Sequence, residues 1–356
     1  MPRHSLTTLG VLAVTAAVVS GAAVSMRSQT AAPRPAAAPA TAPASAAQKP
    51  ALPKPGPAPK TTWGEPDLQG TWFVMESVPM ERSAANANKP MLTDAEVEAL
   101  DKAKSQDQGR NMRSENASRD VDGAYNAVFN SVLRTSKRTS MIIDPPDGRI
   151  PPLTAEAQQR QGRGGGGRGG VGGGRGAAQN DNPETTAQNP RCLGVQMPFL
   201  PLNTAFAQGT VMQIVQSPKS MGIYMEDDHA GGGNRVIYMD GRPHSKAKSV
   251  LGDSIGHWEG ATLVVETRNF AQGFRGSNPA TYRMIEKFTR VDSNNLKREI
   301  TFDDPQTWTK PWTIMIEMGK TNDNRHMIFD SACHEGNYGL TGILVGARRE
   351  EAAAKK

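Results

Sequence analysis

Cysteine is scarce in this sequence, and acidic residues are absent from its first 60 positions. Only two of the 356 residues are cysteine, and none lies within the first 190 positions, so no cysteine near the N-terminus can carry a lipid. The first 60 residues contain no acidic residue and hold six of the 41 Lys and Arg residues. The rest of the chain has 35 basic and 35 acidic residues and is therefore neutral. This balance argues against a nucleic-acid-binding domain.

Long hydrophobic runs are absent except at the N-terminus. An uncharged stretch from Ser5 to Met26 follows Arg3. Its apolar centre, LGVLAVTAAVVSGAAV, is shorter and richer in Ala than the about 20 strongly apolar residues of a membrane-spanning helix. We therefore predict a signal peptide over residues 1–30, cleaved among small residues, and a periplasmic or secreted protein whose mature chain has no membrane span.

Three further segments contain too few large apolar residues to pack. Residues 31–60 are mainly Ala and Pro and are predicted to form a disordered spacer. Residues 161–176, QGRGGGGRGGVGGGRG, are interpreted as a disordered, solvated loop. RNA binding by this loop is not favoured, because it has no aromatic residue and the protein is predicted to be exported. Residues 349–356 are predicted to be a disordered tail.

One helix is predicted near the start of the region that can fold. Thr93 and Glu96 have the spacing of a capping box. Val97, Leu100 and Ala103 then recur at helical spacing, which predicts an amphipathic helix.

After about residue 139 the sequence is typical of strands and turns. Short apolar runs bounded by Pro, Gly, Asn or Asp lie at 140–150, 211–217, 221–227, 235–242, 261–267, 282–291, 296–302, 312–318 and 326–329. The gaps between them are shorter than the crossovers, usually helical, that parallel strands need, so we predict antiparallel pairing.

The clearest hairpin turns at residues 292–295. Met284 and Phe288 share one face of its first strand, and Leu296, Ile300 and Phe302 share one face of its second. These side chains are predicted to face the core.

Together the patterns predict one mainly β domain over residues 63–348, an antiparallel barrel or sandwich with a short helical segment near its N-terminus. The string GTW at 70–72, which leads into FVMESV, resembles the first strand of lipocalin-like barrels. This resemblance favours the barrel.

Five longer strings stand out: IIDPPDGRIPPLT (142–154), RVIYMDGRPH (235–244), GDSIGHWEGATLVVETRNF (252–270), DDPQTWTKPWT (303–313) and ACHEGNYGLTGILVGAR (332–348). Together they resemble a family of hypothetical exported bacterial proteins. The resemblance covers most of residues 65–348 and implies export and a shared fold. It carries over no activity, catalytic residue or cofactor.

Five histidines lie outside the signal segment, and no two of them are three to five residues apart, so the local spacing of zinc motifs is absent. Three have charged neighbours that could complete a site assembled from separate strands: His244 near Arg242, His257 near Glu259, and His334 beside Glu335. A metal site is one interpretation, and hydrogen-bonded structural histidines are the other. No cofactor is identified.

The strings DGRPH and CHEGNY crowd polar side chains into turn-like segments. In a functional site, Arg242 would bind a carboxylate, and His334 and Glu335 would share a proton near neutral pH. In a structural role, the same strings would form tight turns around their glycines.

Trp308 and Trp312 lie four residues apart around a proline in TWTKPW, which speaks against a helical stripe. They are either a stacking platform for a flat ligand such as a sugar or a plug at the end of a barrel.

The string GDSIG at 252–256 fits the nucleophile elbow of serine hydrolases. Asp303 or Asp304 and then His334 follow it in the order of a catalytic triad. The elbow needs a strand before the serine and a helix after it, whereas a turn and a strand are predicted to follow. A β-turn whose polar side chains cap backbone amides is therefore favoured.

Cys192 and Cys333 are predicted to form a disulfide, because an even number of cysteines in an exported protein usually pairs. The alternative is two buried free thiols. Closing a loop of about 140 residues would stabilise the fold by about 5 kcal/mol on the chain-entropy account.

We predict that the protein is a noncatalytic barrel that binds one small apolar or amphipathic molecule. One alternative is a periplasmic hydrolase or lyase with His334 as general base or metal ligand, Glu335 or Glu259 orienting it, and Arg242 holding an anionic group. Another is an envelope scaffold. In both the binding and the catalytic version, six side chains are expected to face one another at one mouth of the barrel: Arg242, His244, His257, Glu259, His334 and Glu335.

Overall fold

The computed structural model describes residues 56–106, 133–163, 211–225, 233–320 and 333–354, with a few positions between 182 and 200 and position 328. The predicted signal peptide, most of the spacer, most of the glycine run and nearly all of the strand predicted at 326–329 lie outside the described residues. None of the helices in the described ranges is long and apolar enough to cross a membrane.

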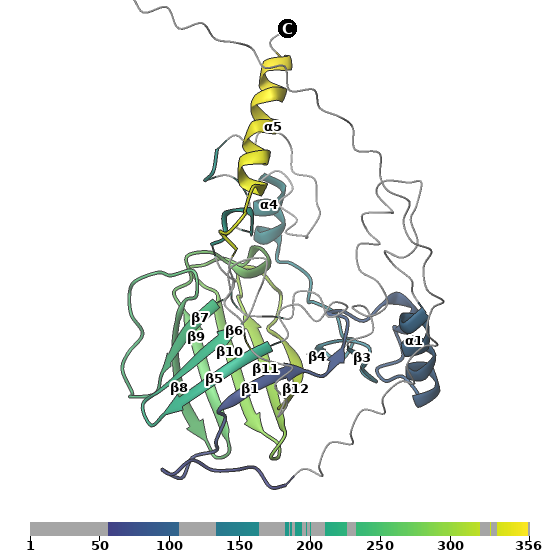
Figure 1. Cartoon of the computed structure of the whole chain (residues 1–356), viewed down its shortest axis with the longest axis vertical. Helices are drawn as coiled ribbons and strands as arrows, with labels where there is room; N and C mark the ends of the chain where they lie inside the picture. Colours follow the sequence, from purple (N-terminus) through teal and green to yellow (C-terminus); the bar gives the residue numbers. More distant parts are fainter. Residues whose placement is uncertain are drawn as a thin grey trace, which may run out of the picture. The chain divides into compact units, whose positions relative to one another are not determined.

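A closed barrel forms the centre of the described structure (Figure 1). Its nine strands follow one another in the order β1, β5, β6, β7, β8, β9, β10, β11 and β12, and β1 pairs with both β5 and β12 to close the ring. Their bounds are β1 Gly70–Val74, β5 Val211–Ser217, β6 Ser220–Met225, β7 Gly233–Tyr238, β8 Asp253–Glu259, β9 Thr262–Arg268, β10 Arg283–Arg290, β11 Asn295–Asp303 and β12 Trp312–Lys320. The prediction of a mainly β barrel is confirmed.

Shorter elements lie outside the ring. The strand β4 pairs with β12, and β2 pairs with β3 in a separate two-stranded sheet. The bounds of these elements and of the helices are β2 Glu76–Ser77, β3 Arg134–Thr135, β4 Ile142–Asp144, α1 Asp94–Gln106, α4 Ala155–Arg163 and α5 Gly339–Ala354.

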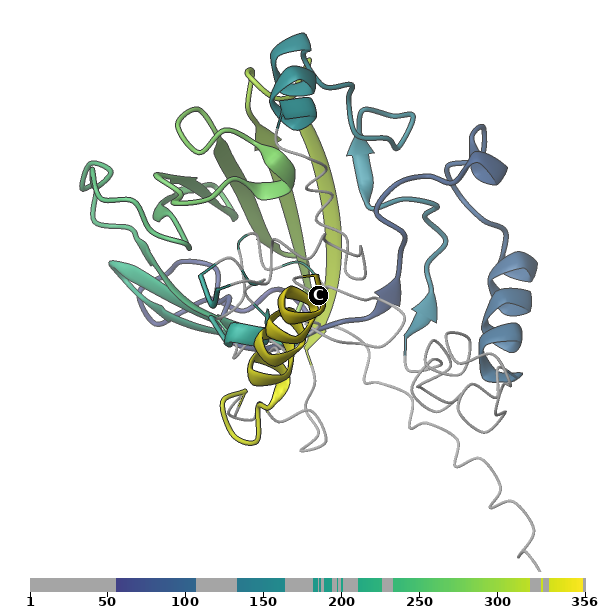
Figure 2. The ribbon, with the colours of Figure 1, turned by 90° about the horizontal axis from the view of Figure 1, so that it is seen from above.

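Alternation along the strands turns the apolar side chains inward, and Figure 2 shows the strands curving round into a ring. The predicted hairpin is β10 and β11, whose register pairs Met284 with Phe302. The side chain of Asp292 holds the turn by accepting hydrogen bonds from the backbone N–H groups of Asn294 and Asn295, at 2.7 and 2.8 Å. The five side chains predicted to face the core, which include Phe288, are all buried, so this prediction is confirmed.

The pairing of β7 with β8 is parallel, which corrects the prediction of uniformly antiparallel strands. The connection over residues 239–252 is long enough for a crossover, and it makes one without forming a helix. The strand β8 itself was not predicted. Its inward positions are Ser254, Gly256 and Trp258, which do not form a plain apolar pattern.

The helix α1 begins as predicted with a capping box, in which Thr93 N–H donates to Glu96 Oε2 at 2.9 Å and Glu96 N–H donates to Thr93 Oγ1 at 3.3 Å. Of the predicted stripe, Val97 is buried and Leu100 is exposed.

The helix α5 corrects a second expectation, because it continues to Ala354 through most of the predicted disordered tail. The sequence RREEAAA has high helix propensity, and Arg348 forms an ion pair with Glu351 one turn later.

Three of the buried charged side chains form an ion cluster inside the barrel. Glu286 of β10 accepts hydrogen bonds from Nε and Nη2 of Arg298 on β11, at 2.9 and 2.6 Å. Its other oxygen lies 2.5 Å from Nη2 of Arg235 on β7. Burial alone would raise the pKa of Glu286, but the two guanidinium groups lower it below its usual value. Because β8 and β9 separate β7 from β10 in the ring, this interior ion cluster joins walls that are not neighbours.

Removing the central carboxylate should destabilise the barrel strongly. Glu286→Gln would leave the guanidinium groups of Arg235 and Arg298 buried without a neutralising carboxylate. It should therefore lower the free energy of unfolding by about 3–5 kcal/mol. Chemical denaturation followed by tryptophan fluorescence measures this change.

The matched control is Glu299→Gln on the outer face of β11, where Lys297 lies 3.4 Å away in a solvent-accessible pair. It should lower the free energy of unfolding by less than about 1 kcal/mol. Equal losses for the two variants would contradict the role of the interior ion cluster.

Candidate functional site

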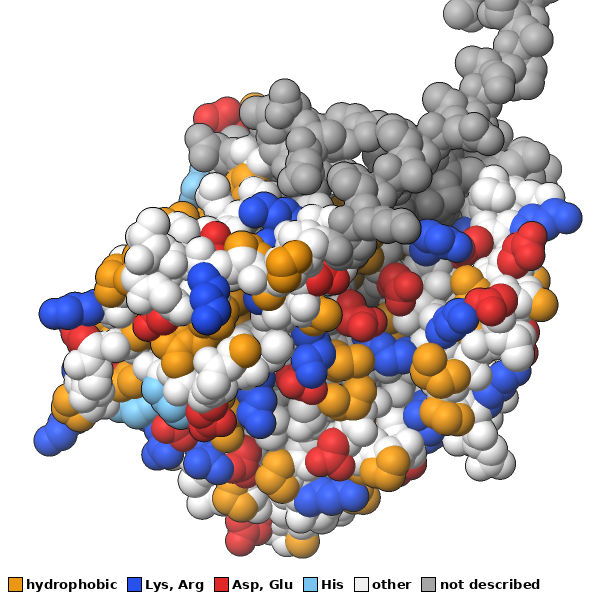
Figure 3. All heavy atoms as spheres, turned by 90° about the horizontal axis from the view of Figure 1, so that it is seen from below, with side chains coloured by type: hydrophobic (Ala, Val, Ile, Leu, Met, Phe, Trp, Pro, Cys, Tyr) orange, Lys and Arg blue, Asp and Glu red, His pale blue; other side chains and the backbone are white. Residues whose placement is uncertain are grey.

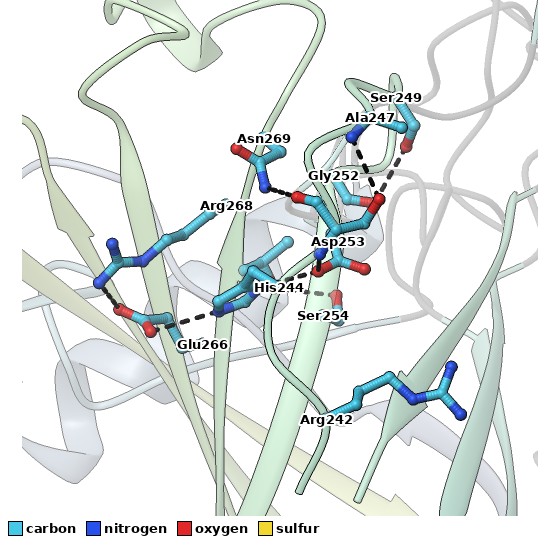
Figure 4. A network of polar contacts seen from close by, with 12 residues as sticks. Arg242, His244, Ala247, Ser249, Gly252, Asp253, Ser254, Glu266, Arg268 and Asn269 are labelled. Atoms are coloured by element: carbon cyan, nitrogen blue, oxygen red, sulfur yellow. Dashed lines mark hydrogen bonds and ion pairs between the residues drawn. The ribbon is translucent and has the colours of Figure 1, made fainter.

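The crossover between β7 and β8 carries the predicted residues Arg242 and His244. Nη2 of Arg242 lies 2.6 Å from Oδ2 of Asp240, and the guanidinium group lies over the ring of Tyr238, 3.8 Å from its centroid. Figure 4 shows the Arg242 side chain apart from His244. Arg242 is therefore paired within its own turn.

His244 lies between two carboxylates, one on each of the next two strands (Figure 4). Its Nδ1 is 2.8 Å from Oδ2 of Asp253, and its Nε2 is 3.4 Å from Oε2 of Glu266. Asp253 also accepts a hydrogen bond from the backbone N–H of Ser245 at 2.9 Å, and the Asn269 amide donates to the Ser245 carbonyl. These contacts fasten the crossover to the start of β8 and the end of β9.

A glycine makes this arrangement possible. Gly252, just before Asp253, has a φ of +70°, and a Cβ at this position would lie 2.8 Å from the carbonyl oxygen of Arg268. Only glycine combines the left-handed conformation with so close an approach of two backbones.

The network continues from Glu266 along the outer ends of β9, β10 and β11. Oε1 of Glu266 accepts hydrogen bonds from Arg268 at 2.7 Å and Arg283 at 3.4 Å, and Arg283 also donates to Asp303 at 3.1 Å through Nε. Burial alone would raise the pKa of Glu266, but the hydrogen bond from Arg268 and the neighbouring charges lower it. The hydrogen bond to Asp303 raises the pKa of Arg283.

We call this set the mouth network, because it lies where β9 and β11 end and β8 and β10 begin. Its members are His244, Asp253, Glu266, Arg268, Arg283 and Asp303. Figure 3 shows acidic and basic side chains interspersed on one face of the protein, with histidine side chains beside acidic ones.

A cavity of about 390 Å³ adjoins the mouth network. Arg268, Arg283 and Asp303 line it, so three of the six members of the network reach the cavity. The other lining residues are Asn269, Pro279, Ala280, Thr281, Tyr282 and Pro305. The walls thus combine charged and hydrogen-bonding groups with proline and alanine surfaces.

Asp304 holds the two loops that form the cavity walls. Its buried carboxylate accepts hydrogen bonds from the backbone N–H of Asn278 and the hydroxyl of Thr281, both at 2.6 Å, and from the N–H of Gln306 at 3.1 Å. Burial alone would raise the pKa of Asp304, but these hydrogen bonds and one from Thr307 lower it below its usual value.

Trp308 and Trp312 are buried and lie under the same loops. Their ring centroids are 5.6 Å apart, and Trp312 stacks on Phe302 at 4.1 Å while Trp308 meets Tyr282 edge-on at 6.4 Å. This placement agrees with the second sequence-based interpretation, packing at the end of the barrel, and Trp308 supports Tyr282, which lines the cavity.

His257 and Glu259 lie near the opposite end of β8 from Asp253. Nε2 of His257 is 3.0 Å from Oε1 of Glu259, and both side chains are exposed. With a rise of about 3.3 Å per residue, four residues separate His257 from Asp253 by about 13 Å along the strand. The expected meeting of this pair with His244 is therefore not observed.

His334 and Glu335 are exposed in the turn before α5. Neither side chain makes a hydrogen bond or ion pair with the described part of the chain. The predicted disulfide beside them is confirmed, since Cys192 and Cys333 are bonded with their Cα atoms 5.7 Å apart. Asn337 supports this turn by donating to the carbonyl of Pro190 at 2.9 Å.

Within the described ranges, no three His, Cys, Asp or Glu side chains are grouped as metal ligands. At His244 the two carboxylates contact different ring nitrogens, so the three groups do not converge on one point. His229 and His326 lie outside the described residues.

Neither the nucleophile elbow nor the favoured β-turn is observed at GDSIG, because the strand β8 begins at Asp253, although Asp253 does cap a backbone amide, that of Ser245. Ser254 is an inward residue of β8, buried in the barrel, where its hydroxyl lies 3.0 Å from that of Thr267 and 3.5 Å from Arg235. No helix follows the serine, Asp303 is paired with Arg283, and His334 lies in the turn before α5.

Sequence comparison adds no identity to this description: no family model and no characterised protein matches the chain.

Most of the mouth network was not predicted from the sequence, although the sequence contains two signals for it. The turn at 292–295 fixes the register of the hairpin and places Arg283 directly opposite Asp303. Glu266 and Arg268 follow the two-residue period of an outward strand face.

The hydrogen bonds to Asp304 predict a pH-dependent stability. Because the pKa of Asp304 is lower in the folded state, its stabilisation is complete above the unfolded-state pKa of about 3.9 and is lost as pH falls through the folded-state value. Wild type should therefore be more stable than Asp304→Asn at pH 6, and the gap should shrink below about pH 4. Urea unfolding from pH 6 to pH 2.5 measures the gap, and a gap that does not change would contradict this role.

Proposed function

We propose that the protein is a noncatalytic binding protein that holds a small amphipathic molecule in the cavity at the mouth of the barrel. The observation that carries the proposal is the cavity itself, whose volume of about 390 Å³ falls within the range of small-molecule sites. Its mixture of apolar and hydrogen-bonding walls matches a ligand with both kinds of surface.

The mouth is favoured over the interior of the barrel because the inward side chains pack against one another. Trp72, Met212 and Phe288, which project from different strands, belong to one buried cluster that fills the ring. A ligand in the interior would have to displace such contacts, whereas the cavity at the mouth is open to a ligand.

The walls suggest how such a ligand would be oriented. Pro279, Ala280 and Pro305 offer an apolar surface on the loops. Arg268 is held by Glu266 through Nη2, while its Nε and Nη1 make no hydrogen bond to the described residues and remain able to donate. The polar end of the ligand would therefore lie toward Arg268 and its apolar end toward the prolines.

Export of the protein is part of the proposal. The disulfide is compatible with an oxidising compartment, and the signal-like N-terminus and the resemblance to exported bacterial proteins support the same location. A periplasmic or secreted binding protein is the role most consistent with these features.

A hydrolase or lyase has less support from the geometry. His244 is oriented by Asp253 through Nδ1, as a catalytic histidine would be, but its Nε2 faces the carboxylate of Glu266 instead of a nucleophile or the cavity. The contacts of His244 correspond to a tether for the crossover.

Filling the cavity tests the proposal. Anilinonaphthalene sulfonate, a fluorescent amphipathic molecule, should bind the native protein at one site. Ala280→Trp should weaken that binding at least about tenfold, because the new side chain occupies space within the cavity. Fluorescence titration measures both affinities.

The matched control is Ala261→Trp, which places the same exposed side chain in the turn between β8 and β9, away from the mouth. It should leave the affinity unchanged. Native protein that binds no dye, or equal affinity in wild type and Ala280→Trp, would contradict the proposal and favour an envelope scaffold.

A further inference from the structure

One wall of the barrel carries no charged residue at its outward strand positions, which belong to β5, β6 and β7. Two cross-strand rows form its centre, and we call them the neutral wall: Gln213, Tyr224 and Asn234 in the first row, and Val215, Gly222 and Val236 in the second. The rows cross β5, β6 and β7, and all six residues alternate with the buried residues of these strands. None of the six lines the cavity at the mouth.

Four of the six residues of the neutral wall are exposed, and Gly222 and Tyr224 between them are half-buried. Val215 is 59% exposed and Val236 is 49% exposed, which is high for β-branched residues at the centre of a sheet. Gln213 and Asn234 are also exposed. Two exposed valines on adjoining positions of one face form an apolar surface that the described structure leaves uncovered.

The other wall of the ring is different. The outward positions of β8 to β11 are rich in charged residues, among them Glu259, Glu266, Lys287 and Glu299. The lack of charge is therefore a property of β5 to β7 and not of the barrel surface as a whole.

A notch lies in the middle of the neutral wall. Gly222 stands between Val215 and Val236 in the register, and a Cβ built on it would meet no atom within 4 Å. Its φ is outside the left-handed region, so neither backbone conformation nor packing requires glycine here. The glycine instead leaves a flat opening between two valine side chains.

The chemistry of these side chains selects the partner. An ionic partner would find no opposite charge on the neutral wall. The amides of Gln213 and Asn234 each offer donors and an acceptor, which suits neighbouring hydroxyl groups. The exposed valines offer apolar surface for the C–H faces of a sugar ring. We propose that the neutral wall binds a neutral polysaccharide, with a sugar ring seated over Gly222.

The size of the wall distinguishes this partner from a second copy of the chain. Adjacent strands lie about 4.8 Å apart and successive rows about 7 Å apart, so the two rows suit a short run of sugar rings. Stable protein dimers bury about 800 Å² on each partner, whereas the six backbone positions of the two rows span only roughly 10 by 7 Å.

Arginine at position 222 would block the wall without disturbing the fold. Native affinity electrophoresis in gels that contain dextran, laminarin or hydroxyethyl cellulose measures binding, and alginate serves as the anionic comparison. The wild type should be retarded by at least one neutral polysaccharide and not by alginate. Gly222→Arg should weaken that interaction at least about tenfold.

Two further variants make the test specific. Asn234→Ala should weaken retardation several-fold by removing one amide. His257→Arg, which places an arginine on the exposed charged wall, should leave retardation unchanged. Thermal unfolding of each variant shows whether it is folded, and Asn234→Ala replaces Gly222→Arg as the deciding variant if the latter is not.

Four results would overturn the inference. They are no retardation by any of the three neutral polysaccharides, retardation by alginate alone, retardation that neither Gly222→Arg nor Asn234→Ala changes, and a dimer in light scattering that Gly222→Arg dissociates. The last result would assign the neutral wall to a second copy of the chain.

Discussion

The buried ion pairs between Glu286 and the two arginines, Arg235 and Arg298, are the constraint on which the barrel depends. Charges inside a protein are tolerated only when each is paired with good geometry, so these contacts fix the distance between β7 and the β10–β11 hairpin. The strands between them must then curve, and the remaining interior is left to apolar side chains. A barrel closed and filled in this way is a rigid frame, and the binding surfaces that we propose lie at its mouth and on its outer face.

Local patterns predicted the fold where each strand follows simple rules. The β10–β11 hairpin was predicted with its turn and inner faces, because the turn at 292–295 and the alternation of apolar residues specify the same register. The strand β8 was missed because Ser254 and Gly256 occupy its inward positions. Glu286 and Arg298 occupy positions on the inner faces that a sequence pattern assigns to apolar residues, and only the tertiary structure shows that they pair.

The candidate site was harder to predict than the fold. Strings dense in ionisable residues were expected to meet at one mouth, but turns belong to both ends of a barrel. His244 reaches the mouth, whereas His257 lies toward the other end of β8 and His334 stays on the surface. The charges that do meet at the mouth come from strand ends. Their encounter depends on the order of strands around the ring, which a single sequence does not display.

The mouth network and the interior ion cluster stabilise different parts of the structure. Glu286 and its two arginines connect opposite walls of the barrel. Asp304 and the aromatic residues beneath the loops stabilise the loops around the cavity, at the ends of β9 and β11. The parallel crossover, fastened by His244, completes the rim beside Arg268. On this account the rim recognises the ligand and the barrel supplies rigidity.

A crystal structure of the protein with bound anilinonaphthalene sulfonate tests this account most directly. It predicts ligand density between Pro279, Pro305 and Arg268, with the interior side chains and the contacts of Glu286 unchanged. Density inside the ring, with Met212 and Phe288 displaced to admit the ligand, would contradict it.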